Sequence, residues 1–219
     1  MAPGLLVFRA VKLFTALLLA LLGAAATAGA GDLAAAVQAE INLARTAPRQ
    51  YARIVAQETK THRLTEGDRA VREAIRFLEK TARLPALQRS AGLRAAARCH
   101  VRDQGPVGGT GHRGDDWSTP AQRMARFGRW GERMAENIAY GESDARSIVV
   151  RLIVDDGVRD RGHRLNIFAR EFRRVGVATG PHARYGTMCV IEFAGTFKER
   201  ADELRERAKL PPKPFFRWY

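Results

Sequence analysis

The stretch RVGVATGPHARYGTMCVIEFAG, residues 174–195, decides the fold class. It contains two runs rich in β-forming residues, RVGVATG (174–180) and YGTMCVIEFAG (185–195), and glycine bounds both of them. Glycine-bounded runs of this kind are typical of two antiparallel strands. Because they come late in the chain, after a series of helical patterns, we expect an α+β sandwich.

The sequence before these strands predicts a series of helices. Apolar residues at helical spacing mark them, together with proline in first turns and polar capping residues. The predicted helices cover residues 32–45, 48–54, 65–82, 90–100, 119–128 and 144–156. A glycine-rich loop is expected at residues 105–119, and the alternating run ENIAYG (136–141) predicts one more short strand.

The N-terminal segment has the pattern of an export signal. Arg9 and Lys12 precede an uncharged apolar run over residues 13–26, and small residues at 26–30 fit an A-x-A cleavage site. The run is shorter than the roughly 20 residues that span a bilayer, which favours a cleaved signal peptide over an uncleaved anchor. We therefore expect an exported protein, extracellular or periplasmic.

The domain organisation follows from this segment and from the composition. A chain of 219 residues with 46% hydrophobic side chains can form a packed core in one domain, or at most two small ones. We expect a signal peptide at residues 1–30, one domain at 31–197 and a basic, aromatic-ended tail at 198–219.

Two cysteines, Cys99 and Cys189, raise the question of a disulfide. An exported protein with an even number of cysteines can pair them, and this bond would join a helix to a distant strand. The alternative is two buried thiols. The even number of cysteines in an exported chain favours the disulfide.

Histidines and acids that could form a site are spread over four segments. They are His112 in TGHRGDD, Glu136 in AENIAYG, Asp155, Asp156 and His163 in IVDDGVRDRGHRLNIF, and Glu192 in MCVIEFAG. Two neutral imidazoles and a carboxylate suit Zn²⁺, and an open position would allow Lewis-acid chemistry or an activated water. Each residue also has an ordinary structural interpretation, and Glu192 is expected on the solvent-facing side of its strand.

The two adjacent aspartates end a predicted helix. The helix dipole disfavours negative charge there, so Asp155 and Asp156 should have a compensating partner. They could alternatively serve only the backbone N–H groups of the turn at Gly157.

Five motifs occur in an order that resembles bacterial members of the CAP superfamily, whose SCP domain is found in cysteine-rich secretory, antigen 5 and pathogenesis-related 1 proteins. The motifs are SAGLRAAARCHVRD (90–103), GHRG (111–114), ENIAYG (136–141), GHRLNIF (162–168) and VGVATG…YGTMCVIEFAG (175–195). The similarity extends over residues 32–196. It implies a three-layer α-β-α sandwich with a small central antiparallel sheet.

The resemblance also implies a cleft with two histidines and two acids, which binds a divalent metal in some members. By motif, the histidines are His112 and His163, and the first acid is Glu136. The family usually has a glutamate as the second acid, where this chain offers Asp156, which we prefer, or Asp155. Zn²⁺ or another divalent cation is the implied cofactor.

The resemblance implies an extracellular role but no single activity. Because no G-x-S-x-G motif and no nucleophile accompany the histidines, we favour a non-catalytic binding module for a lipid, a small apolar molecule or an envelope component. The alternative is a zinc-dependent hydrolase that uses the same cleft, with an acid as general base.

The formal charge of +14 predicts attraction to anionic envelope polymers or membrane surfaces. The basic residues that group in the sequence are Arg123, Arg126, Arg129 and Arg133, and then Arg159, Arg161 and Arg164. Solvated helix faces are the alternative interpretation. Nucleic acid is not expected as a partner, because the exported chain carries no recognised reader motif.

Overall fold

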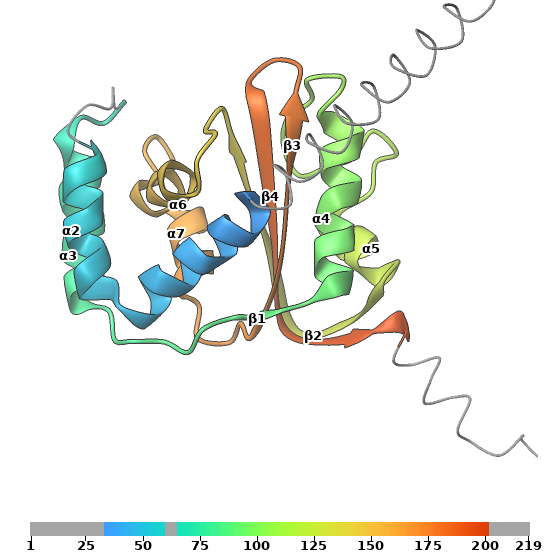
Figure 1. Cartoon of the computed structure of the whole chain (residues 1–219), viewed down its shortest axis with the longest axis horizontal. Helices are drawn as coiled ribbons and strands as arrows, with labels where there is room; N and C mark the ends of the chain where they lie inside the picture. The colour runs from blue at the N-terminus through green and yellow to red at the C-terminus, as the bar shows by residue number, and fades with distance from the viewer. Residues whose placement is uncertain (1–32, 60–64, 202–219) are drawn as a thin grey trace, which may run out of the picture.

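A mixed sheet of four strands forms the centre of the protein, in the order β1-β3-β4-β2 (Figure 1). The computed structural model describes residues 33–59 and 65–201. The strands are β1 (Gln88–Arg89), β2 (Gly128–Tyr140), β3 (Arg174–His182) and β4 (Gly186–Glu199). β4 pairs antiparallel with β3 and with β2, as predicted for the central strands, whereas the two-residue β1 runs parallel to β3.

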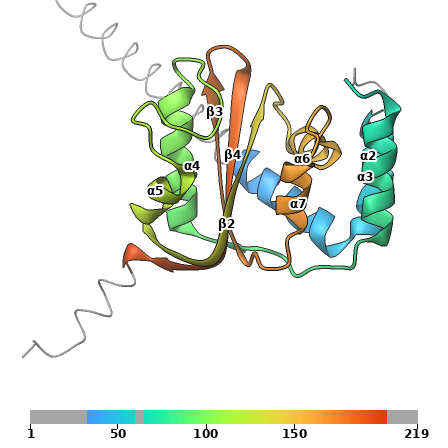
Figure 2. The same ribbon diagram turned by 180° about the vertical axis from the view of Figure 1, so that it is seen from behind.

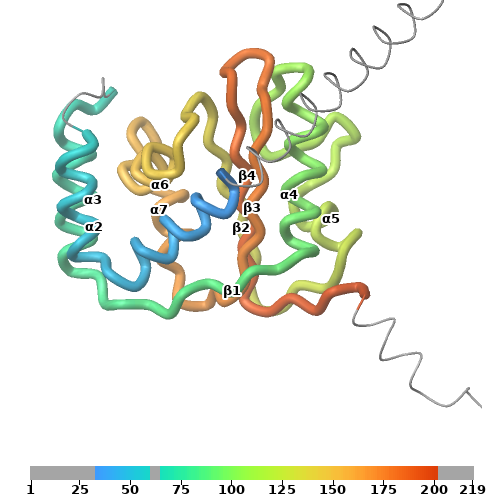
Figure 3. Tube along the Cα trace, viewed as in Figure 1, coloured from blue at the N-terminus to red at the C-terminus, as the bar shows by residue number. Residues whose placement is uncertain are grey.

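Helices cover both faces of this sheet, which confirms the predicted α-β-α sandwich (Figure 2). One layer contains the helix over residues 33–46 and α2 (Pro48–Glu58), α3 (Asp68–Lys80), α6 (Ala145–Val154) and α7 (Gly162–Phe168). The other layer contains α4 (Ala91–Gln104) and α5 (Pro120–Ala125). The chain passes between the layers through β1, as the tube in Figure 3 shows.

The central strand β4 packs against both layers, because successive side chains point to opposite faces of a sheet. Ile191 and Phe193 belong to the large core shared with the helices of the α2–α3 layer. Val190 and Ala194 pack instead in two smaller clusters with residues of α4. Both faces of β4 are therefore covered by helices.

The disulfide prediction is wrong for the same reason. Cys99 lies on α4, whereas Cys189 faces the opposite layer with Ile191 and Phe193. The sheet separates the two side chains, and both cysteines are free thiols. Burial raises the pKa of the Cys189 thiol to about 12.

Several predicted elements differ from the observed ones in extent. β2 begins at Gly128 instead of Glu136, because its first residues pair with Lys198 and Glu199 at the end of β4. Gly128, expected to end a helix, opens this strand, and a Cβ there would lie 2.3 Å from the Lys198 carbonyl oxygen. The short helix α7 and the strand β1 were not predicted from the sequence.

The expected boundaries are only partly within the described residues. Residues 1–30, the expected signal peptide, lie outside them, as does most of the expected tail at 198–219. Within residues 33–59 and 65–201, no helix combines the length and apolarity needed to cross a membrane.

Candidate functional site

His112 pairs with Glu136 on the face of β2 that α4 and α5 cover. The imidazole Nδ1 of His112 lies 2.8 Å from Glu136 Oε1, and Arg123 donates from Nη2 to Glu136 Oε2 at 2.6 Å. Arg123 is buried and also donates to the carbonyl oxygens of His112 and Ser118, which fixes the loop that carries the histidine. A single guanidinium thus positions both members of the pair.

The charge on Glu136 is well compensated. Burial by itself would raise the pKa of this carboxyl, but the hydrogen bond with His112 and the charge of Arg123 outweigh it and lower the pKa. Glu136 is therefore an anion that has two partners before any ligand arrives.

Glu192 lies opposite Glu136 in the register of β2 and β4, and it is completely buried. The expectation of a solvent-facing position is thus wrong, because α4 covers this face of the sheet. Burial and the negative charge of Glu136 raise the pKa of Glu192 well above its usual value. The signal for burial is present in the sequence, since Met188, Cys189, Val190 and Ile191 are apolar without alternation.

His163 pairs with Asp155 in the other helical layer. The imidazole Nδ1 of His163 lies 2.7 Å from Asp155 Oδ1. Asp155 follows the last residue of α6 in a left-handed conformation, with φ of 56°. From there, its Oδ2 accepts the backbone N–H groups of His163 and Arg164 in the first turn of α7. A carboxylate at a helix N-terminus is favourably placed, which meets the expectation of a compensating partner.

Asp156 does not contact His163. Its carboxylate accepts the backbone N–H groups of Thr65 and Glu66, which attaches the start of the α3 segment to the end of α6. Of the two aspartates considered for the second acid, the structure brings Asp155, the alternative, to the histidine, and not the preferred Asp156. The left-handed backbone at Asp155 separates the directions of the two neighbouring side chains.

The two histidine–acid pairs approach β2 from different helical layers but are not sealed from each other, because Ile138, which packs with α4, lines the same cavity as His163. Glu136 faces α4 and α5, whereas the next residue, Asn137, donates from Nδ2 to the carbonyl oxygen of His163 on α7 at 3.0 Å. β2 is an edge strand of the sheet. One ion could therefore contact both imidazoles around the free edge of this strand.

The four residues do not fit a metal centre with four ligands. Each histidine uses Nδ1 for its acid and keeps Nε2, an arrangement common for metal-binding histidines. The acids, however, are engaged by Arg123 and by the N-terminus of α7. In the part of the chain that the structure describes, no three His, Cys, Asp or Glu side chains are grouped to hold a metal. Glu136 and Asp155 orient the imidazoles instead of offering free oxygens.

A cavity of about 410 Å³ opens beside α6, and we call it the α6 cavity. Its apolar walls include Ile138 of β2 and Val150 and Val154 of α6, and His163 and Asp155 also line it. His112 and Glu136 are not among its lining residues. Only one of the two histidine–acid pairs therefore faces this space.

Two tyrosines of the cavity were not considered in the sequence analysis. The rings of Tyr140 and Tyr185 lie 5.5 Å apart between centroids, and His182 packs against both. The hydroxyl of Tyr140 accepts the backbone N–H of Gly111, next to His112. Both tyrosines lie in quoted motifs, Tyr140 within ENIAYG and Tyr185 at the start of YGTMCVIEFAG, but only the turn between β3 and β4 brings Tyr185 to the cavity.

Comparisons with known proteins agree with this architecture. The family model of the cysteine-rich secretory protein family, CAP, matches residues 38–193. No curated protein sequence matches the chain significantly.

Two bacterial structures are similar at low identity. An extracellular protein containing an SCP domain from Bacillus anthracis is 23% identical, with a TM-score of 0.41, over 51% of this chain and 34% of that one. An outer surface protein from Borrelia burgdorferi is 16% identical, with a TM-score of 0.42, over 53% of this chain and 80% of that one. The chain thus spans about a third of the Bacillus protein. Because the family model matches well over half of its residues, the chain belongs to the cysteine-rich secretory protein (CAP) family.

Proposed function

We propose that this protein is an exported, non-catalytic binding module that takes a small amphipathic molecule, such as a single-chain lipid, into the α6 cavity. The cavity itself carries the proposal: its volume of about 410 Å³ lies within the roughly 300–1,000 Å³ typical of ligand sites. Its walls combine aliphatic side chains of α6 and β2 with one histidine–acid pair. An apolar chain and a polar head group would both find complementary surroundings.

The polar end of the cavity is fixed before a ligand binds. Asp155 is held by two backbone N–H groups and by His163, so the imidazole has a defined orientation. His163 keeps Nε2 for a head group, and its side chain is 26% exposed. Prearranged polar groups of this kind reduce the entropic cost of binding.

The contacts of the described cavity residues favour a binding role over catalysis. Ser147 is the serine among the cavity-lining residues, and it bonds with Asp144 at the start of α6. Asp155, the acid that contacts His163, is hydrogen-bonded to the imidazole Nδ1 and to the backbone N–H at the start of α7. Export is supported by the basic and apolar pattern of the first thirty residues.

The alternative function, a zinc-dependent hydrolase, would need both imidazoles and an acid on one ion. The engagement of each acid by other groups, Glu136 by Arg123 and Asp155 by the N-terminus of α7, argues against it. In our proposal, a divalent cation would be bound by the Nε2 atom of only one imidazole.

The test fills the cavity without touching the histidine pair. Ser147→Trp places an indole in the α6 cavity, and Ser143→Trp, four residues earlier at an exposed position, is the matched control. We expect the wild-type protein and Ser143→Trp to bind a fluorescent single-chain fatty acid equally. Ser147→Trp should bind it about tenfold more weakly, a loss of about 1.4 kcal/mol.

Fluorescence titration gives the affinities, and thermal melting checks that both variants fold. If the wild-type protein takes up no fatty acid or lysophospholipid, the lipid proposal fails. Equal affinity of the two tryptophan variants would exclude the α6 cavity as the binding site.

A further inference from the structure

The arginine groups that the sequence suggested as an anion-binding surface are largely neutralised by acids. The ion pairs are Arg123–Glu136, Arg126–Asp116, Arg133–Glu171, Arg161–Glu66, Arg161–Glu73 and Arg164–Glu73. Arg123 and Arg164 are in addition buried. These paired arginines are compensated by nearby acids, and a further row of positive charge lies on α4.

A row of arginines follows the outer side of α4. Arg94, Arg98 and Arg102 recur at every fourth residue, so they lie on one stripe, about 6 Å apart along the helix axis. Arg98 and Arg102 are exposed and Arg94 is half-buried. Within residues 33–59 and 65–201, none of the three forms an ion pair with an acid. We call these three residues the α4 arginine row.

The charge of this row is uncompensated locally. Partial burial lowers the pKa of Arg94, and the positive charges of Arg89 and Arg98 lower it further. Arg89, on β1, therefore extends the positive region beyond the start of α4. The acid on α4, Asp103, accepts the backbone N–H of Asp115, and its carboxylate serves that loop.

The surface of α4 is polar, with no large apolar side chain exposed. The large hydrophobic side chains exposed in the described residues are Val107, Trp117, Trp130, Leu165 and Tyr185, and none of them lies on α4. A helix that inserts into a bilayer surface presents apolar residues beside its basic ones. The α4 arginine row therefore suits a soluble polyanion better than a membrane.

We infer that the α4 arginine row binds a linear polymer that carries phosphate groups along its length. Guanidinium groups match phosphate with two parallel hydrogen bonds, and three of them in line favour a chain that runs parallel to the helix axis. α4 lies on the opposite side of the sheet from α6 (Figure 1), and no residue of α4 lines the α6 cavity, so this site goes beyond the proposed function and does not depend on it.

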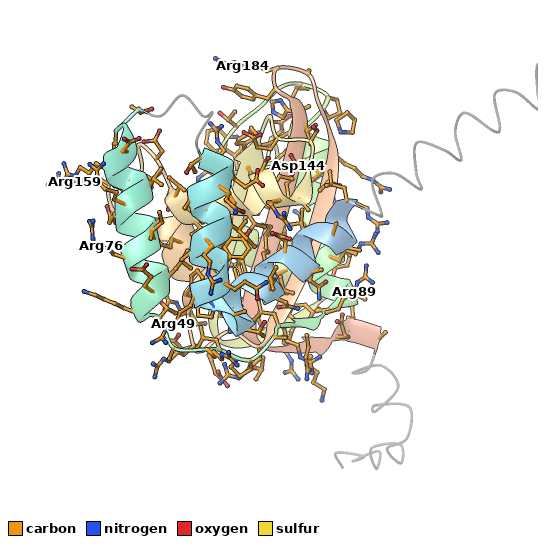
Figure 4. The ribbon with its side chains drawn as sticks, turned by 60° about the vertical axis from the view of Figure 1, so that its left-hand side comes forward. Arg49, Arg76, Arg89, Asp144, Arg159 and Arg184 are labelled. Carbon is orange, nitrogen blue, oxygen red and sulfur yellow. The ribbon has the colours of Figure 1, made fainter. Side chains whose placement is uncertain are left out.

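A second arginine row provides a matched control. Arg69, Arg72 and Arg76 are exposed on α3, in the other helical layer. Acids share that helix, and Arg72 lies 3.7 Å from Asp68. Figure 4 shows Arg76 on the outer side of α3, well away from Arg89 near the start of α4. Replacing this row removes the same charge from a different place.

The experiment measures binding of inorganic polyphosphate to the purified protein at several salt concentrations. Replacing Arg94, Arg98 and Arg102 together by glutamine should weaken binding at least about tenfold and reduce the slope of log affinity against log salt by about 2. Replacing Arg69, Arg72 and Arg76 by glutamine should change the affinity less than about twofold. Circular dichroism and melting check that both triple variants fold.

Three results would overturn the inference. One is an equal loss in both triple variants, because binding would then follow net charge and not the row. Another is absence of polyphosphate binding by the wild-type protein at low salt. The third is tighter binding to phosphatidylglycerol vesicles than to polyphosphate with the same dependence on the α4 row, which would make a membrane the partner.

Discussion

The carboxyl group of Glu192 lies in the interior of the protein, opposite Glu136 of the neighbouring strand. It has no exposed surface, and the charged groups that act on it are Glu136 and Arg123. Glu136, its register partner, is already bound by His112 and Arg123. His112 and Arg123 compensate the negative charge of Glu136, and a second charge on Glu192 would repel it. Glu192 should therefore be protonated in the folded protein.

This arrangement predicts how stability depends on pH. Folding raises the pKa of Glu192 above its usual 4.5. The stabilising contribution of Glu192 to the free energy of unfolding is therefore fully present below pH 4.5, and it is lost as the pH rises through the higher pKa of the folded state. Glu192→Gln removes the titration, so its melting temperature should exceed that of the wild type by about 3–6 °C at pH 8 and by much less at pH 4.

Thermal melting of the two proteins between pH 4 and pH 8 checks this prediction. Glu79→Gln, at an exposed position of α3, is the control. It should change the melting temperature by no more than about 1 °C at either pH 4 or pH 8. Parallel pH profiles of wild type and Glu192→Gln would show that Glu192 is ionised in the fold.

At the scale of elements, the contact between α4 and β3 brings α4 close enough to cover Glu192. Gly176 of β3 makes it possible, since a Cβ there would lie 2.1 Å from the Arg94 backbone nitrogen and 2.2 Å from the Leu93 carbonyl carbon. Both are backbone atoms, which cannot turn away as a flexible side chain can. The helix rests directly on the strand at this residue.

We therefore predict that Gly176→Ala lowers the free energy of unfolding by about 2–3 kcal/mol, through forced separation of α4 from β3. Gly162→Ala is the control, because its added Cβ would lie 3.5 Å from Asp160 Oδ1, an ordinary contact. Urea unfolding of both variants measures the effect. A Gly176→Ala protein as stable as Gly162→Ala would contradict the close packing.

Most helices could be predicted because their signals are local. Ser90, Thr119 and Asp144 accept backbone N–H groups as N-caps at the helix starts expected for them. The first half of β2 could not be predicted, because GRWGER (128–133) has no strand-like alternation and extends only through its pairing with β4. β1 is likewise defined by its partner, β3.

For the whole molecule, the position of β2 between the two histidine–acid pairs decides what the site can do. His112 belongs to the α4 side and His163 to the α7 side. The order of the motifs could not reveal this separation, since it does not show on which side of the sheet each residue lies. In the fold, the two pairs are thus held by different helical layers.

Zinc titration by calorimetry tests this division. We expect His112→Ala and His163→Ala each to remove only the weak binding of one imidazole, so that their effects add. Circular dichroism confirms that the variants fold. If either substitution alone abolished a tight site of one equivalent, the two histidines would share an ion, and the hydrolase alternative would become the better account.

The sequence by itself determined the α+β class, the helices with local caps, the two late strands and the family motifs that single out His112, Glu136 and His163. These features depend on neighbouring residues or on short patterns. Only the tertiary structure decided the pairing of Asp155 with His163, the burial of Glu192 and the separation of the cysteines. Each of these depends on which face of the sheet a side chain occupies and which distant groups cover that face, and no local pattern specifies both.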